Sequence, residues 1–236
     1  MAIDKYRDNE VALDTIGKED LPPVDPGVPG FLTRVAVCLC LDTSGSMSGE
    51  RIRKLQAGLE HFKEDLKNDR HAFMAADLSI VTFDSHARVV LPFTPMKDVS
   101  MPLLATGGMT SLGEGVLLAL DQLEQRKAYY KANGISYNRP MLFIISDGCD
   151  NGDKSKTIEA KKLIAQYERE KKVTAFGINV DDKSAISELT DLTGKQALPL
   201  DSKNYALFFE WLSNSVSTKS QAKTDTISLP AITWIG

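Results

Sequence analysis

Five oxygen-bearing side chains follow apolar runs or a glycine-rich loop, and their chemistry suits a hard metal ion. The segment "LDTSGSMSG" (residues 41–49) places Asp42, Ser44 and Ser46 directly after a run of apolar residues. Thr110 ends the glycine loop "TGGMT", and Asp147 follows another apolar run, within "SDG". Carboxylate and hydroxyl oxygens are preferred by Mg²⁺, with Mn²⁺ or Ca²⁺ as alternatives. The sequence therefore predicts a magnesium site made by these five side chains.

The balance between carboxylates and hydroxyls predicts what such a site would do. Asp42 and Asp147 would repel each other unless a cation lay between them, whereas hydroxyls add ligands without adding charge. With one coordination position left free, some carboxylates would act through ordered water. The ion would then keep positive charge and attract a carboxylate from outside. We expect the ligand to be an Asp or Glu side chain of a partner protein.

The elements that must position these side chains alternate between strand-like and helix-like patterns. Residues 35–41 are continuously apolar, which is typical of a strand covered on both faces. Residues 50–68 repeat apolar side chains every three or four positions, which predicts an amphipathic helix. The runs 77–84 and 87–93 are separated by two residues, so we expect a hairpin with one antiparallel edge strand.

The same alternation continues to the end of the chain. The expected elements are a helix opened by a capping box at Ser111–Glu114, a strand at 141–148 after Pro140, a helix at about 154–171, a strand at 173–180, a short helix from 184, the run "QALPL" and a last helix around "YALFFEWLSNSV". This order predicts an α/β fold with a doubly wound, mostly parallel sheet, one antiparallel edge strand and helices on both faces, similar to Rossmann folds.

Composition and charge exclude several classes of partner. The 236 residues carry a net charge of -4, from 32 acids and 28 bases, without a basic block that could follow a phosphate backbone. The first thirty residues lack a secretory signal, and no segment approaches a membrane span. Cys38, Cys40 and Cys149 are poorly placed to pair, Cys38 and Cys40 because they alternate on one strand. We expect a reduced, cytoplasmic chain that binds neither nucleic acid nor a membrane.

The domain organisation follows from the loop-forming residues. Residues 1–30 read as an extension ending in a Pro/Gly linker, 31–220 as the folded domain and 221–236 as a Ser/Thr-rich tail.

Three motifs occur in chain order: Asp-x-Ser-x-Ser after the first strand, a glycine loop ending in Thr, and Ser-Asp-Gly after the fourth strand. Together they resemble the metal-ion-dependent adhesion site (MIDAS) of von Willebrand factor A (vWA) domains. The resemblance covers about residues 31–220. "ANGISYNRP", "ALPL" and "FFEWLSNSVS" resemble the small, stand-alone bacterial TerY-type proteins of tellurium resistance. It implies that Asp42, Ser44, Ser46, Thr110 and Asp147 are the metal-site positions.

The resemblance also implies a cellular setting. It is that of a bacterial stress or tellurium-resistance operon, whose products include a protein kinase and a PP2C-type phosphatase as partners. One departure from the pattern follows Ser-Asp-Gly, where Cys149, Asp150 and Asp153 replace the usual Pro-Thr-Asp type segment. We expect the two acids on the rim of the site, where they would repel an acidic partner or bind a further cation, and we expect Cys149 to be partly buried.

Other functions compete with the binding module. Asp42 could be the nucleophile of a Mg²⁺-dependent phosphohydrolase, although only Arg51 and Arg53 come near to clamping a phosphate. Glu114 stands where a nucleotide-binding loop needs lysine. A serine hydrolase would need a base, and His86, in the hairpin turn, is the candidate at the right edge of the sheet. We therefore predict a protein that is not an enzyme.

A last hypothesis is that the chain masks its own site. The acidic N-terminal segment could offer a carboxylate to the metal, from Glu10, Asp14, Glu19, Asp20 or Asp25.

Overall fold

A computed structural model describes residues 32–181, 184–201 and 204–222. The N-terminal extension with its acidic residues, and the tail beyond residue 222, lie outside the described residues. The strands are β1 Arg34–Asp42, β2 Ala76–Phe83, β3 Ala87–Pro95, β4 Tyr137–Ser146, β5 Thr174–Val180 and β6 Leu198–Leu200. The α-helices are α2 Glu50–Asn68, α3 Arg70–Ala75, α4 Leu112–Ala132, α5 Lys154–Arg169, α6 Ser184–Thr193 and α7 Tyr205–Gln221. Two short 3-10 helices are η2 Gly45–Met47 and η3 Met96–Asp98.

The six strands form one sheet in the order β3-β2-β1-β4-β5-β6. All neighbouring strands are parallel except β3, which runs antiparallel to β2 at the edge. Pro92 lies in this edge strand and is exposed, where its missing N–H costs no central hydrogen bond. The predicted doubly wound sheet with one antiparallel edge strand is confirmed.

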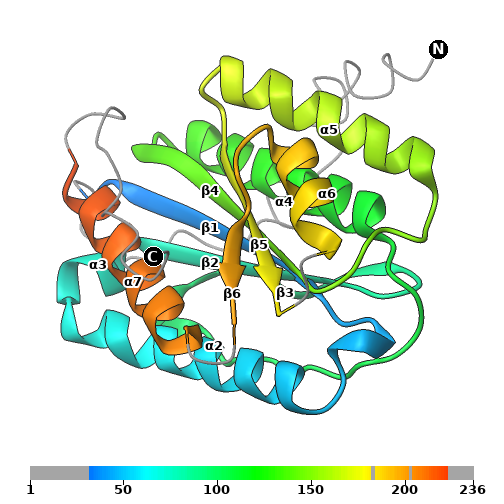
Figure 1. The fold of residues 1–236 in the computed structure, drawn as a ribbon. Coiled ribbons are helices and arrows are strands. Elements are labelled where there is room, and N and C mark those ends of the chain that lie inside the picture. Colours follow the sequence, from blue (N-terminus) through cyan, green and yellow to red (C-terminus); the bar gives the residue numbers. More distant parts are fainter. Residues whose placement is uncertain (1–31, 182–183, 202–203, 223–236) are drawn as a thin grey trace.

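Helices cover both faces of the sheet (Figure 1). Val35, Val37, Leu39 and Leu41 of β1 belong to the core that packs under α2 and α7. The intervening residues Ala36, Cys38 and Cys40 belong to the second core, which packs under α4, α5 and α6. Since both faces of β1 are buried, every position of this strand must be compatible with a core, which explains its continuous apolar run.

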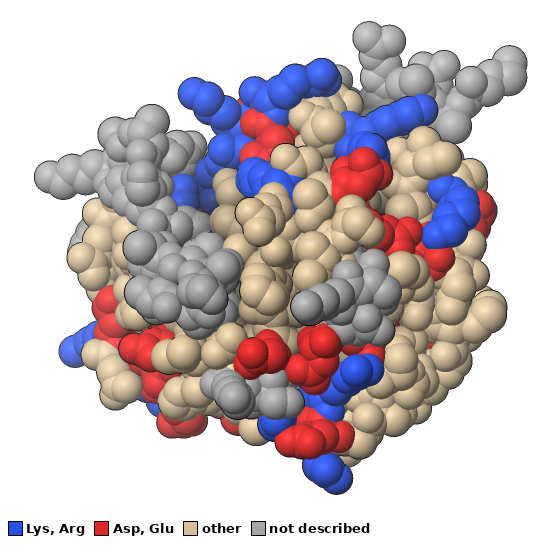
Figure 2. Space-filling model, viewed as in Figure 1, with Lys and Arg blue, Asp and Glu red and all other residues tan. Residues whose placement is uncertain are grey.

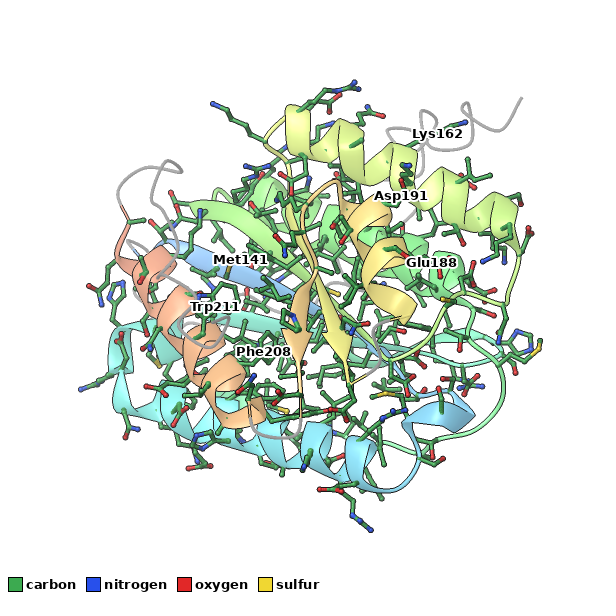
Figure 3. All side chains as sticks on the ribbon, in the orientation of Figure 1. Met141, Lys162, Glu188, Asp191, Phe208 and Trp211 are labelled. Carbon is green, nitrogen blue, oxygen red and sulfur yellow. The ribbon has the colours of Figure 1, made fainter. Side chains whose placement is uncertain are left out.

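The aromatic residues of α7 belong to the first core. Phe208 and Trp211 are directed from α7 towards the sheet (Figure 3), with ring centroids 6.4 and 6.0 Å from that of Phe143 in β4. Phe208 is fully buried and Trp211 is 5% exposed. Packing therefore accounts for these aromatic side chains.

A buried ionic cluster joins the elements at the amino ends of β1 and β2. The Asp77 carboxylate, fully buried, accepts hydrogen bonds from Arg34 Nε over 3.2 Å, from Arg126 Nη2 over 2.7 Å and from the Tyr130 hydroxyl. Both arginines are nearly buried. Because a buried charge is costly without a partner, this cluster fixes α4 against β1 and β2.

Three details differ from the sequence-based predictions. α3 was not predicted, because six residues are too few for a clear periodic pattern. β4 begins at Tyr137 rather than after Pro140. The capping box at the start of α4 does not form, since Ser111 Oγ donates to Ser85 O and Glu114 binds Ala87 N and Lys156.

Figure 2 shows one face of the molecule, with Lys and Arg gathered over α5 and acidic side chains interspersed with basic ones lower down. In the part of the chain that the structure describes, no helix is long and apolar enough to cross a membrane.

Candidate metal centre

Asp42 is the innermost of the predicted site residues. It ends β1, is fully buried, and lies in line with Phe83 of β2. Its Oδ1 accepts a hydrogen bond from Ser44 N over 2.8 Å, and its Oδ2 accepts one from Ser146 Oγ over 2.5 Å. The pKa of Asp42 is raised to about 6, mainly because the carboxyl group is buried. The hydrogen bonds offset part of this increase, and the nearby charge of Asp147 adds to it. The carboxylate is thus held in place but is poorly compensated in charge.

The loop after β1 turns its two serines towards the strand that follows in the sheet, β4. Met47, in η2, is fully buried in the core beneath and anchors the loop. Ser44 Oγ lies 3.0 Å from Ser46 Oγ, and Ser46 Oγ donates to Asp147 Oδ1 over 2.7 Å. Asp147 is only 2% exposed. Four of the five predicted residues are therefore linked by hydrogen bonds that run from β1 to β4, directly or through Ser146.

Thr110 reaches the same place through the glycine loop. Gly45 N donates to Gly108 O over 3.1 Å, and Gly107 N donates to Thr43 O over 2.9 Å, so the two loops lie backbone to backbone. Gly108 has a φ of 73°, which favours glycine. A methyl group on Gly148 would lie 3.9 Å from both Ser46 Oγ and Thr110 Oγ1. The Thr110 and Ser46 hydroxyls therefore both border the same point beside Gly148.

Two further charged side chains belong to this site. Arg51, in the first turn of α2, donates from Nη1 to Asp147 Oδ2 and, over 3.1 Å, to Ser46 O. Its Nε lies 3.5 Å from Asp181 Oδ2. Asp181 directly follows β5. Its position after a strand could have marked it as a site residue, as it did for Asp42 and Asp147, but Asp181 was not predicted. Ser146 was missed because it belongs to the strand itself.

Of the two acids in the loop after β4, Asp150 is buried rather than on an exposed rim, contrary to expectation, whereas Asp153 is exposed. Asp150 is 4% exposed, and its carboxylate binds Leu112 N over 3.1 Å, Gly152 N over 3.0 Å and the Thr157 hydroxyl. Asp153 caps α5, accepting from Ser155 N over 2.9 Å. Both acids thus serve helix termini. Cys149 is exposed, so the expectation that it is partly buried was wrong.

The hydrolytic interpretations find no support in the geometry. Both oxygens of Asp42 accept hydrogen bonds from within the protein, which hold the carboxylate in place. Within the described ranges no hydrogen bond joins a histidine ring to Ser44 or Ser46. His86 is exposed in the turn, and its backbone N donates to Asp84 Oδ1 over 3.1 Å. A serine nucleophile needs such a base.

The residues at the site fit a hard cation. They offer two carboxylates and three hydroxyls, all oxygen, on three neighbouring loops. Among the described residues, no group of three or more His, Cys, Asp or Glu side chains could hold a metal ion. Hydroxyls, by contrast, make up most of the donors at this site. The set excludes thiolate and imidazole metals and suits Mg²⁺.

Comparison with known proteins gives a consistent picture. Residues 37–149 match the family model described as the von Willebrand factor type A domain. The matched segment includes all five candidate residues from Asp42 to Asp147. No curated protein matches the chain.

Solved structures share the fold at low sequence identity. The vWF domain of the type V pili tip protein Mfa5 from Porphyromonas gingivalis has a TM-score of 0.60 and 12% identity, over 82% of this chain and 98% of that one. The pilus adhesin SpaC from Lactobacillus rhamnosus GG gives 0.59 and 13%, over 80% of this chain and 31% of that one. A von Willebrand factor type A protein from Catenulispora acidiphila gives 0.54 and 17%, over 79% and 43%. The chain therefore spans less than half the length of the last two proteins.

Proposed function

We propose that this chain, of which residues 37–149 match the family model of the von Willebrand factor type A domain, binds a partner protein through a divalent ion, preferably Mg²⁺, at a metal-ion-dependent adhesion site. Ser44, Ser46 and Thr110 would offer neutral oxygens, and Asp42 and Asp147 would offer carboxylates. The ion would supply positive charge and a free coordination position for an Asp or Glu carboxylate of the partner.

One observation carries this proposal: the Ser44 and Ser46 hydroxyls lie 3.0 Å apart, and Ser46 Oγ is 2.7 Å from Asp147 Oδ1. These groups come from loops about one hundred residues apart in the chain. Two carboxylates near each other, one with its pKa raised by burial, leave negative charge that a cation would neutralise. Donors of this kind grouped at the carboxyl ends of parallel strands favour a binding site there.

A role in binding rather than in catalysis is supported by the described residues. Among these residues no histidine ring is hydrogen-bonded to Ser44 or Ser46, so neither serine has the base that a nucleophile needs. Among proteins of the same fold are a pili tip protein and a pilus adhesin. For this chain, the sequence resemblance favours the TerY type, with a stress or tellurium-resistance setting in the cytoplasm and a protein kinase or PP2C-type phosphatase as partner.

The experiment is a pull-down from a lysate of the native cells with the whole chain as bait. Wild type in Mg²⁺ should retain a protein that is lost in EDTA and lost with Ser46→Ala. Ser46 is exposed, so this change should leave the fold intact. Asp191→Asn, on the surface of α6 with a Lys161 partner, is the control and should bind as wild type. Retention of the same protein in EDTA and by Ser46→Ala would refute the proposal.

A further inference from the structure

Arg51 places a fixed positive charge at the edge of the candidate metal centre. Its guanidinium binds Asp147 Oδ2 and Ser46 O through Nη1 and approaches Asp181 through Nε. The side chain is 31% exposed, so it also reaches solvent. Arg51 therefore touches two of the groups that would surround a metal ion while remaining open to a ligand.

The charges of the site make this arginine necessary for an acidic ligand. Asp42, Asp147 and Asp181 carry one negative charge more than a divalent ion would neutralise. Glu50 is nearby but is paired with Lys54 over 2.6 Å. Without Arg51 the loaded site would keep a net negative charge and repel a carboxylate; with Arg51 the charges balance.

Tyr205, the first residue of α7, supplies a second observation. It is 6% exposed, and among the described residues its hydroxyl has no hydrogen-bond partner. Burial raises the pKa of Tyr205, and the charges of Asp181, Arg51 and Asp147 also act on it, so Tyr205 lies within electrostatic range of the same site. A buried hydroxyl without a partner is unfavourable, so a ligand oxygen that reached it would gain a hydrogen bond.

From these observations we propose that Arg51, assisted by the Tyr205 hydroxyl, binds the second oxygen of the carboxylate whose first oxygen would reach the metal ion. This inference rests on the proposed function and names the residues that select a carboxylate over a neutral ligand. A carboxylate has two oxygens, and a guanidinium is suited to bind one of them through a charge-assisted hydrogen bond. In the metal-free protein the same guanidinium neutralises Asp147.

The two roles of Arg51 predict effects of opposite sign. Because the guanidinium and a divalent ion would compete for the Asp147 carboxylate, Arg51→Gln should bind the metal more tightly. Because the second oxygen of the ligand loses its donor and the site becomes negative, the same variant should bind a carboxylate more weakly. A merely structural role would weaken both.

The test uses the whole chain, Mn²⁺ alone as the metal, and acetate as the carboxylate. Water-proton relaxation by bound Mn²⁺ reports metal binding, and acetate lowers the signal as it displaces bound water. In Arg51→Gln we expect a metal Kd at least about threefold lower and an acetate Kd about tenfold higher. Tyr205→Phe should raise the acetate Kd by about threefold and leave the metal Kd unchanged. Acetamide, a neutral analogue, should show no difference between variants.

The matched control is Arg53→Gln, the same charge change two residues along α2 at an exposed position. It should behave as wild type. An acetate Kd in Arg51→Gln equal to that of wild type would overturn the inference while leaving the proposed function standing. If wild type does not bind Mn²⁺, or if acetate does not displace water from the bound ion, the proposed function itself fails. An unchanged acetate Kd in Tyr205→Phe would overturn the part assigned to Tyr205.

Discussion

Asp150 Oδ1 accepts a hydrogen bond from the backbone N of Leu112 over 3.1 Å, which ties the loop after β4 to the first turn of α4. Thr110 precedes this turn by two residues, and Thr110 O accepts from Asn151 N over 3.0 Å. The two loops that carry Thr110 and Asp147 are therefore fixed to each other through Asp150 and its neighbour Asn151.

Removing Asp150 should cost stability without removing a metal ligand. In Asp150→Ala, Leu112 N and the Thr157 hydroxyl lose a buried acceptor, and we expect the free energy of unfolding to fall by about 2–3 kcal/mol. Asp153→Ala, which removes only the cap of α5, should cost about 1 kcal/mol. Urea unfolding measures both. Equal costs in the two variants would contradict the structural role assigned to Asp150.

Metal ions should stabilise the folded chain. At a free Mg²⁺ concentration about 100 times its Kd, binding to the native state should add about 2.7 kcal/mol to the free energy of unfolding and raise Tm by several degrees. The increase should disappear in EDTA and in Ser46→Ala, and should be retained in Asp191→Asn. Scanning calorimetry with and without Mg²⁺ checks this. A Tm that does not respond to metal in wild type would count against the metal centre.

The buried ionic cluster should be a large single contributor to stability. Asp77→Asn leaves Arg34 and Arg126 buried without their anion, so we expect a loss of about 3–5 kcal/mol in the free energy of unfolding. Tyr130→Phe removes one hydrogen bond of the same cluster and should cost about 1 kcal/mol. Chemical denaturation of both variants tests the difference. A cost below about 1 kcal/mol for Asp77→Asn would show that the cluster does not hold α4 to the sheet.

The three cysteines should differ sharply in reactivity. Burial raises the pKa of the Cys38 thiol to about 12 and raises that of Cys40 well above its ordinary value, so both stay protonated at neutral pH. Cys149 is exposed. A thiol reagent at pH 8 should therefore modify one cysteine in the native protein and all three in denaturant. Mass spectrometry of Cys149→Ser, which should remain unmodified when native, is the control; labelling of that variant in its native state would be the contrary result.

The sequence predicted which residues can meet at the edge of the sheet, because its apolar runs show where the strands end. A continuous apolar run such as 35–41 must be a strand buried on both faces, and in a parallel sheet its end lies beside the ends of its neighbours. That reasoning sufficed for the sheet, for the helices on both faces and for the approach of Asp42, Ser44, Ser46 and Asp147 to one another. It assigned Asp150 wrongly, because a charged residue in a loop gives the same sequence pattern whether it faces solvent or binds a helix terminus.

Only the tertiary structure decided how the charges of the site are compensated. Arg51 and Asp147 are 96 residues apart in the chain and Asp181 lies on a third element, so no local pattern could reveal that one guanidinium serves both carboxylates. The same holds for Arg34 and Arg126, which meet at Asp77 from separate elements. Sequence periodicity reports which face of an element is buried, whereas ion pairs depend on distances that exist only once the elements have packed.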